Sequence, residues 1–329
     1  MNEKPDPAQP PTVSIIVISY NTREMTLDCL HSIAAQTRCP YEVIVLDNAS
    51  SDGSPEAIAK AFPEAVLLAE TTNHGFAQGN NMAIHHARGE HILLLNPDTI
   101  VLNGAIDRLL DFAQRTPEAQ IWGGRTLYGD HSLNPTNCWR QMTLWSLTSQ
   151  FLGLSSLFNG STLFNPEGYG GWPRDEEREV DIITGCFFLI RKSLWEQLNG
   201  FDGTYVMYGE EADLCLRARK HGARPQMTPD AEIVHYGGAS ETVRADKVVR
   251  LITAKTTLVR HYFPKWQRPL GLMMLRLWPW SRMLAARFRA RATGRKQHRE
   301  AAENWAEVWQ RRGEWRSGYP DRGPTPQRT

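Results

Sequence analysis

Four segments in a fixed order constrain the fold of this chain more than any other feature of its sequence. Three are apolar runs of β-strand type that end in small polar or acidic residues: VSIIVISYN (13–21), VIVLDNASSDGS (43–54) and HILLLNPD (91–98). The fourth, MYGEEADLCLR (207–217), opens with acidic residues. Ligands of open α/β sheets bind beyond the carboxyl ends of the strands. We therefore expect Asn21, Asp47 and Asp98 to converge on one crevice, as a sugar- or metal-binding site requires.

The N-terminal part of the sequence alternates between strand-like and helix-like segments from Val13 to about Arg115. Ser54 followed by Pro55 is a typical helix start, and Gly89 ends another helix. A helix is expected after each strand. The predicted strands are 13–19, 41–47, 65–70 and 91–96. Strands that alternate with helices indicate an α/β fold with a mainly parallel sheet flanked by helices.

The second half of the sequence is less regular. Residues 116–180 are rich in Trp, Gly, Asn and Pro, and we expect loops and short helices there. Long irregular stretches inside a domain are usually functional or mobile. Regular elements return after this stretch: a strand at 181–191, a helix that ends at Gly200, an acidic helix at 210–221 and a strand at 231–236.

Composition and charge narrow the class of protein. The 329 residues allow one large domain or two smaller ones, and 41% hydrophobic residues suffice for a sizeable core. A net charge of +1 gives no indication of a nucleic-acid partner. The charge is uneven, however, because the stretch from Lys265 to Arg299 holds ten Lys or Arg and no Asp or Glu. This tail is a basic patch on an otherwise balanced protein.

The cysteines and the apolar runs bear on the cellular compartment. Five scattered cysteines without a C-x-x-C pair argue against a disulfide framework or a zinc site and favour a reducing cytosol. Residues 1–12 are polar and Pro-rich, so we expect a disordered lead without a signal-peptide core. No apolar run reaches the ~18 residues of a membrane span. The run at 270–280 is short, contains Arg276 and is broken by Pro279.

Two of the strand ends carry chemistry. A carboxylate such as Asp47 at a strand end accepts hydrogen bonds from a ribose or a base, although a turn or capping role is an equal alternative. In Asn96-Pro97-Asp98 the proline biases the preceding residue to extended geometry, so the side chains two apart point the same way. That arrangement suits Mg²⁺ or Mn²⁺, which take oxygen ligands, but Asn-Pro-Asp is also a common turn.

The acidic helix start holds three carboxylates within four residues, Glu210, Glu211 and Asp213. Acidic residues favour helix N-termini, yet three exceed what capping needs. Glu210 and Asp213 share a face and Glu211 points elsewhere, so we expect one carboxylate to act as base and the others to orient the acceptor or a partner arginine. His235 ends a strand and is either a metal or phosphate ligand or a buried structural histidine.

The glycines of NHGFAQGNN (73–81) open a helix, where backbone N–H groups bind anions. Small residues there also permit close packing of helix and sheet. Both interpretations apply to Gly75 and to the neighbouring Asn80.

Taken together, these segments resemble glycosyltransferase family 2, especially its bacterial rhamnosyltransferase-like members, over about 13–240. The motifs that carry the resemblance, in order, are VSIIVISYN, VLDNASSDGS, NHGFAQGNN, LLLNPD, TGCFFLIRK, MYGEEADLCLR and VHYGGAS. The resemblance implies a GT-A fold with a Rossmann-like nucleotide-sugar half (13–115) and an acceptor half (116–262). It also implies inverting transfer of a sugar, for example rhamnose, from a nucleoside-diphosphate sugar to a saccharide or lipid-linked acceptor in cell-surface polysaccharide synthesis.

The resemblance assigns roles to individual residues. Glu211 falls on the position of the base, usually Asp, beside Glu210 and Asp213, and Asp98 and His235 fall on a site for Mg²⁺ or Mn²⁺ in which Asn96 replaces the first carboxylate. The residues assigned to the nucleotide sugar are Tyr20, Asn21, Asp47, Asn73, Gly75, Asn80 and Asn96.

The tail at 263–329 lies outside the resemblance. Its pattern predicts a basic amphipathic helical segment, a last helix at 302–315 and a disordered end. Its part 264–299 either lies on an anionic membrane surface or packs on the domain. A cytoplasmic protein, held peripherally on the inner face of the plasma membrane, is the expectation that fits a lipid-linked acceptor.

Two other classes of protein compete with the glycosyltransferase. A sugar nucleotidylyltransferase is expected to have a Gly-rich basic loop after the first strand, and SYNTREM (19–25) has no glycine. A non-catalytic nucleotide-sugar-binding or scaffold protein remains open, because Asn96 and Glu211 depart from the family pattern.

Overall fold

The centre of the computed structural model, which describes residues 10–237 and 244–320, is a ten-stranded sheet with the order β3-β2-β1-β4-β11-β6-β12-β5 and with β7 and β9 at its side. A separate two-stranded sheet pairs β8 with β10. The strands are β1 (Val13–Ser19), β2 (Tyr41–Asp47), β3 (Val66–Ala69), β4 (His91–Leu95), β5 (Thr99–Val101), β6 (Ile121–Leu127), β7 (Leu133–Asn134), β8 (Cys138–Trp139), β9 (Arg178–Glu179), β10 (Ile182–Ile183), β11 (Phe187–Arg191) and β12 (Gln226–His235).

The sheet is parallel in its first half and mixed in its second. Strands β3, β2, β1 and β4 run parallel, whereas β11 is antiparallel to both β4 and β6. Strand β12 is parallel to β6 and antiparallel to β5. The carboxyl ends of β1, β2, β4, β6 and β12 therefore lie at one edge, which confirms the predicted α/β class and its mainly parallel first half.

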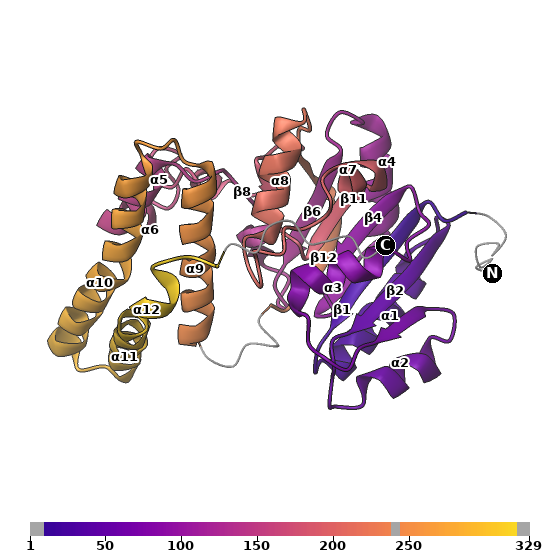
Figure 1. Cartoon of the computed structure of the whole chain (residues 1–329), viewed down its shortest axis with the longest axis horizontal. Coiled ribbons are helices and arrows are strands. Elements are labelled where there is room, and N and C mark those ends of the chain that lie inside the picture. Colours follow the sequence, from indigo (N-terminus) through magenta and orange to yellow (C-terminus); the bar gives the residue numbers. More distant parts are fainter. Residues whose placement is uncertain (1–9, 238–243, 321–329) are drawn as a thin grey trace.

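Helices cover both faces of the sheet (Figure 1). The helices are α1 (Arg23–Gln36), α2 (Ser54–Ala61), α3 (Gly75–Ile84), α4 (Ala105–Arg115), α5 (Leu144–Leu152), α6 (Leu154–Leu157), α7 (Lys192–Gln197), α8 (Glu210–Lys220), α9 (Arg244–Tyr262), α10 (Arg268–Thr293), α11 (Lys296–Gln310) and α12 (Arg312–Trp315). Alternate side chains of β1 face opposite layers, since Ile15 packs with α1 and α4 while Ile16 packs with α3, α7 and α8. Every residue of β1 is buried, as expected of a central strand with helices on both faces.

Strand β6 is a central strand that the sequence pattern did not predict. It lies within the stretch expected to hold only loops and short helices, and its middle is Gly123-Gly124. A Cβ on Gly124 would lie 2.2 Å from the Ala231 carbonyl oxygen, and a Cβ on Gly123 would lie 2.6 Å from Ile183. Close packing therefore requires the two glycines, and those glycines remove the β-type signal from the sequence.

Three other elements differ from their predicted bounds. The predicted strand 181–191 is two strands, β10 and β11, separated at Gly185. Helix α3 ends at Ile84 rather than beside Gly89. Helix α10 continues through Pro279, because the flanking Leu275 and Met283 are buried and tertiary packing outweighs the helix-breaking effect of the proline.

Helices α5, α6 and α9–α12 form a helical part beside the sheet (Figure 1). Helix α10 packs on α5, α9 and α11. Small apolar clusters hold these helices together, one around Val249, Ile252 and Trp315 and another around Leu147 and Val259. The structure thus shows the tail helices packed on other helices of the chain, which is one of the two alternatives expected for the tail. The division into a domain at 13–262 and a tail at 263–329 stays a prediction, and the expected disorder of 1–12 falls mainly on residues 1–9, outside the described range.

Candidate active site

Asp47, at the carboxyl end of β2, is fully buried and only partly satisfied. Its Oδ1 accepts a hydrogen bond from the Ser50 N–H at 2.8 Å, whereas its Oδ2 is buried without a partner in the described chain. A buried carboxylate oxygen without a donor costs free energy unless a ligand supplies one. The geometry therefore suits a carboxylate that accepts a hydrogen bond from a bound ribose or base.

Asn21 stabilises the loop that carries Asp47. Its N–H donates to the Ser50 hydroxyl and its side-chain oxygen accepts from the Ser51 N–H, both at 2.8 Å. Its φ of 52° is in the left-handed region, which asparagine tolerates better than most residues. Asn21 thus joins the ends of β1 and β2. The neighbouring Tyr20 is 41% exposed at the same edge, where its ring is available to a ligand.

Asn48 is a contributor to this edge that the sequence pattern did not single out. Its side chain accepts from the His74 N–H at 2.8 Å and donates to the Gly75 carbonyl at 3.2 Å. Asn73 in turn accepts from the Gly75 N–H at 2.9 Å, which closes the turn before α3. Gly75 has φ of 78° and lies against the Val206 carbonyl, so a side chain there would be strained and crowded.

Asn80 lies one turn inside α3 and is almost fully buried. Its amide donates to the Phe76 carbonyl at 2.9 Å, while its Oδ1 has no partner among the described residues. Helix α3 thus begins beside the Asp47 loop, but the side chain of Asn80 lies within the packed layer below the helix start.

Asn96, Asp98 and His235 meet at the carboxyl edge, although His235 is 137 residues beyond Asp98 in the sequence. The antiparallel pairing of β5 with β12 places Thr99 opposite His235. As a result, His235 Nε2 lies 3.3 Å from Asp98 Oδ1 and 3.4 Å from the Asn96 amide. The structure therefore brings together the three residues that the sequence assigned to the metal motif.

The charge on His235 depends on opposing effects. Burial disfavours its charged form, but the neighbouring Cys186 side chain and the Asp98 carboxylate outweigh burial and raise the pKa of His235 to about 10. In the metal-free chain the imidazole therefore donates to Asp98, and a bound cation would displace this proton, because a ligating histidine is neutral. Its Nδ1 is buried without a hydrogen-bond partner in the described chain.

These side chains offer a divalent cation one carboxylate, one amide oxygen and one imidazole, a donor set that Mn²⁺ accepts and Mg²⁺ accepts through the oxygens. Within residues 10–237 and 244–320, no cluster of three or more His, Cys, Asp or Glu side chains has a geometry that would hold a metal ion. These side chains alone are too few to hold a cation, so the donor set fits a cation to which a substrate supplies the remaining ligands.

Glu210 and Glu211 open α8 directly after Gly209. Glu210 is 4% exposed and Glu211 is half-buried, and the Oε2 atom of each is enclosed without a partner among the described residues. Burial, followed by the neighbouring charge of Glu211, raises the pKa of Glu210 well above its ordinary value. Burial likewise raises the pKa of Glu211. Two adjacent carboxyls with raised pKa values are characteristic of proton-transfer sites.

Asp213, one turn further, is fully engaged by other residues. Its Oδ2 accepts from Arg217 Nε at 2.7 Å and its Oδ1 accepts from the Tyr262 hydroxyl at 2.5 Å. Arg217 also donates to the carbonyls of Leu198 and Gly200. The side chain of Asp213 therefore orients a partner arginine and anchors α8. This is the second of the roles that the acidic helix start suggests.

Contacts through the start of α3 connect the acidic pair with the metal motif. Gly75 lies against Val206, four residues before Glu210, and Phe76 lies 3.3 Å from the Cβ position of Gly185. The backbone carbonyl of the next residue, Cys186, accepts a hydrogen bond from the Asn96 N–H at 3.2 Å. The acidic loop and the metal motif therefore flank the same short stretch of chain.

The fold and this site define a GT-A glycosyltransferase. Over the whole chain, the structure is similar to that of a mannosyltransferase, PcManGT from Pyrobaculum calidifontis in complex with GDP-Man and Mn²⁺. The TM-score is 0.58 at 18% identity, and 95% of this chain and 89% of the other are covered. At that identity the likeness establishes the fold.

Sequence comparison establishes the family. The model for Glycosyl transferase family 2 matches residues 14–198, and the chain belongs to this family. An N-acetylglucosaminyl-diphospho-decaprenol L-rhamnosyltransferase of Mycobacterium tuberculosis is 29% identical, with 68% of this chain and 75% of the relative covered. Rhamnosyltransferase WbbL of Escherichia coli is 26% identical, with 68% and 83% covered. The chain is therefore an inverting, rhamnosyltransferase-like glycosyltransferase of cell-surface polysaccharide synthesis, with a nucleotide-sugar donor and an acceptor as substrates.

Proposed function

We propose that Glu211 is the general base that activates an acceptor hydroxyl for attack on the donor sugar. The observation that carries this proposal is the pair of buried, unpartnered carboxylate oxygens at the start of α8, because such atoms need a proton donor from a substrate. Glu211 is the more accessible of the pair, and Glu210 is nearly buried. Glu210 accordingly orients the acceptor.

The reaction is a single displacement. The acceptor oxygen forms a bond to the anomeric carbon, the bond from that carbon to the diphosphate oxygen breaks, and the acceptor proton passes to Glu211. A base with a pKa raised toward neutrality accepts this proton more effectively than an ordinary glutamate does. Asp47 and the Asn21 loop hold the nucleoside, with Tyr20, Asn73 and Gly75 beside it.

Asp98 and His235, with Asn96 beside them, would hold Mg²⁺ or Mn²⁺. When bound, the ion supplies positive charge for the departing diphosphate. Because only one of these side chains is a carboxylate, we propose that the diphosphate completes the ligand set and that the ion binds tightly only with the donor.

The relatives suggest the finer substrate class. We propose a deoxyhexose such as rhamnose as the sugar and a lipid-linked saccharide as the acceptor, because two relatives are named rhamnosyltransferases and one of them carries a diphospho-decaprenol in its name. The mixed polar and aromatic stretch at 116–180 would contact the acceptor.

A transfer assay with purified protein and a panel of nucleoside-diphosphate sugars tests this function. Turnover is expected to require Mg²⁺ or Mn²⁺ and to stop in excess chelator. Asp98→Ala is expected to abolish metal-stimulated binding of the nucleoside diphosphate. Asp230→Ala, at an exposed position of β12, is the matched control. Binding of a donor without any transfer or hydrolysis would instead support the non-catalytic binding protein, and full activity in chelator would remove the metal from the mechanism.

We also propose that the helical part rests peripherally on an anionic membrane, at the cytoplasmic face. No helix within the described residues is long and apolar enough to span a bilayer. Helix α10 leaves one apolar stripe uncovered, and its residues are spaced three, four or seven apart on one helical face. They are Leu270, Met273, Trp280, Leu284 and Phe288, and each is at least 40% exposed. Basic residues and no acids flank this stripe, which suits an anionic lipid surface.

Vesicle flotation tests the membrane proposal. The double variant Leu284→Ser, Phe288→Ser is expected to lose binding to anionic vesicles, and added salt is expected to weaken binding of the unaltered protein. Val66→Ser, an exposed apolar residue on β3, is the control and is expected to bind as the unaltered protein does. Failure of the unaltered protein to bind anionic vesicles at low salt would refute this proposal.

A further inference from the structure

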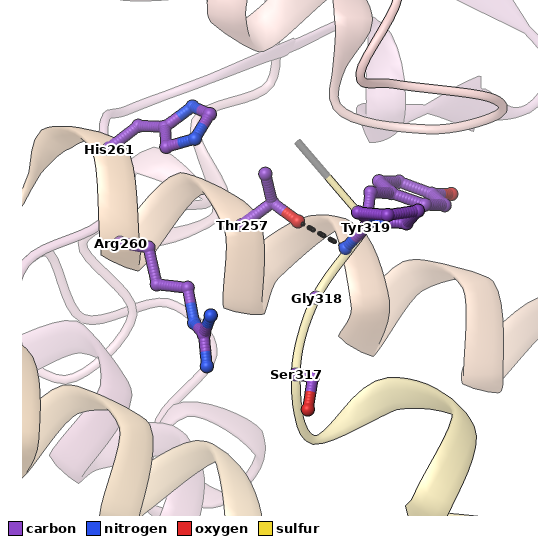
Figure 2. A pocket seen from close by; sticks show the side chains of 7 residues that line it. Thr257, Arg260, His261, Ser317, Gly318 and Tyr319 are labelled. Carbon is purple, nitrogen blue, oxygen red and sulfur yellow. Dashed lines mark hydrogen bonds between the residues drawn. The ribbon is translucent and has the colours of Figure 1, made fainter. Parts of the chain in front are cut away.

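The described chain ends in a short segment, residues 317–320, that follows α12 and packs against α9. We call it the C-terminal strap. The Tyr319 N–H donates to the Thr257 hydroxyl of α9 at 2.8 Å, as Figure 2 shows. Gly318 has φ of 70°, and a Cβ there would lie 2.7 Å from the same hydroxyl oxygen. The strap and α9 border a cavity of about 480 Å³ whose lining includes Arg260 and His261.

The side chain of Tyr319 reaches past α9 to the loop that precedes the acidic pair. Its hydroxyl donates to the Met207 carbonyl oxygen. Its ring packs edge-on against Tyr205, with 6.1 Å between the ring centroids. One residue near the end of the described chain therefore holds two residues of the loop that leads into α8.

That loop has a backbone that needs support from its surroundings. Tyr208 and Gly209 are both in the left-handed region, at φ of 68° and 91°, directly before Glu210. A non-glycine residue in this region is strained and persists only where its surroundings hold it. The Tyr205 ring and Ala254 close on Gly209, since a Cβ there would lie 3.0–3.1 Å from them. The hydrogen bond to Met207 acts on the residue just before this strained pair.

The strap also lies within electrostatic range of the acidic pair. Burial, followed by the charge of Glu210, raises the pKa of Tyr319 to about 12, and Glu211 adds to this effect. Tyr319 therefore keeps its proton at any physiological pH and remains a hydrogen-bond donor to Met207.

We propose that Tyr319 is a positioning residue for the general base, holding the loop at 205–209 so that Glu210 and Glu211 are enclosed and correctly aimed. This inference rests on the proposed role of Glu211. Helices α9–α12 lie between the family motifs and Tyr319 in the sequence, so the helical part contributes a residue to the active site in addition to its apolar surface.

The test compares Tyr319→Phe with Tyr41→Phe in the full chain. Tyr319→Phe removes only the hydroxyl donor. Tyr41→Phe removes the same group at the amino end of β2, on the edge of the sheet opposite the candidate site. Tyr319→Phe is expected to lower kcat by about 5- to 100-fold, because small displacements of catalytic groups have effects of this size. Donor affinity is expected to stay unchanged, and Tyr41→Phe is expected to keep full kcat.

Two further measurements separate positioning from a general loss of stability. Hydrogen exchange of the amides at 205–211 is expected to quicken in Tyr319→Phe and not in Tyr41→Phe. The acidic limb of the kcat profile is expected to move to lower pH, because water admitted beside the glutamates lowers their raised pKa values. Thr257→Val, which removes the acceptor of the strap amide, is expected to show the same changes to a smaller extent.

The outcomes are distinguishable. If the unaltered protein transfers sugar and Tyr319→Phe keeps its kcat, its pH profile and its amide protection, the positioning role is wrong while the proposed function stands. If the unaltered protein transfers no sugar, the proposed function fails. Amide exchange then still decides whether Tyr319 holds the loop.

Discussion

The two predicted halves of the domain, 13–115 for the nucleotide sugar and 116–262 for the acceptor, are held together in different ways. In the nucleotide-sugar half, 13–115, buried strands alternate with helices, and many polar contacts at the site are local, such as Ser50 to Asp47 and Gly75 to Asn73. In the acceptor half, 116–262, polar contacts between distant residues hold the irregular segments, such as Lys255 to Glu167. Because its order is local, the structure of the first half can be predicted from sequence patterns. The structure of the second half depends on tertiary contacts.

Arg174 is the strongest case of such a distant contact. It is completely buried and donates to the carbonyls of Trp172 and Pro135 at 2.6 and 3.1 Å, with further donors directed at Gly168. Its guanidinium also lies 4.9 Å from the centre of the Trp172 ring. A single cation thus organises the stretch in which the sequence shows few periodic runs.

The largest expected effect concerns the acidic pair, in which we propose Glu211 as the base. Glu211→Gln keeps the size of the side chain but cannot take a proton, so turnover should fall by ~10²–10⁴-fold with donor affinity nearly unchanged. Glu210→Gln is the matched control and should lose less. Steady-state kinetics and donor-binding measurements on both variants show which glutamate is the base. A dead Glu210→Gln beside an active Glu211→Gln would make Glu210 the base.

Replacing Arg174 tests the claim that one buried cation holds the acceptor half. Arg174→Met leaves several buried carbonyls without donors, each worth about 1–3 kcal/mol, so the free energy of unfolding should fall by at least about 3 kcal/mol. Denaturant unfolding measures this. Arg115→Met breaks an exposed pair with Glu177 and a contact with the Phe112 ring, and its effect on the free energy of unfolding should be much smaller. Equal losses for the two variants would contradict the difference between the halves.

In the nucleotide-sugar half, Asp47→Asn tests the unpartnered carboxylate oxygen. Loss of a hydrogen bond to a charged group costs about 1.5–3 kcal/mol, which corresponds to about 10- to 100-fold weaker nucleotide binding. Calorimetric titration with a nucleoside diphosphate gives the number. Asp52→Asn, in the same loop but bonded to Ser54 and Arg23, should leave that affinity unchanged. Normal affinity in Asp47→Asn would show that the nucleoside does not bind at Asp47.

The smallest expected effect is a shift in pH dependence. Glu211 must be deprotonated to act, and burial raises its pKa, so the acidic limb of kcat should lie above the ordinary glutamate value of about 4.3. The charge of Glu211 raises the pKa of Glu210, so Glu210 is still neutral while Glu211 loses its proton, and Glu210→Gln should leave that limb above about 4.3. A raised folded pKa also means that ionisation costs stability as pH increases through it, so Glu210→Gln should stabilise the protein at pH well above that pKa. A limb near 4.3 in both proteins would show that the pair is solvated.

The sequence by itself determined the α/β class, the first four strands and the polar residues at their carboxyl ends. Those features depend on local periodicity, since a helix directly follows each of β1, β2 and β3, and α4 follows the pair β4 and β5. It also assigned Asp98 and His235 to one metal motif through a family resemblance, and the pairing of β5 with β12 places them 3.3 Å apart.

Other residues beside the candidate site are brought there by long-range contacts. Asn48, Cys186 and Tyr319 give no signal in sequence, because an isolated Asn, Cys or Tyr has no periodicity to mark it. Strand β6 was hidden because Gly123 and Gly124 are required by close packing rather than by β propensity. The course of α10 through Pro279 was likewise decided by burial of its neighbours. In each case the deciding energy comes from contacts between residues distant in sequence, which local patterns do not encode.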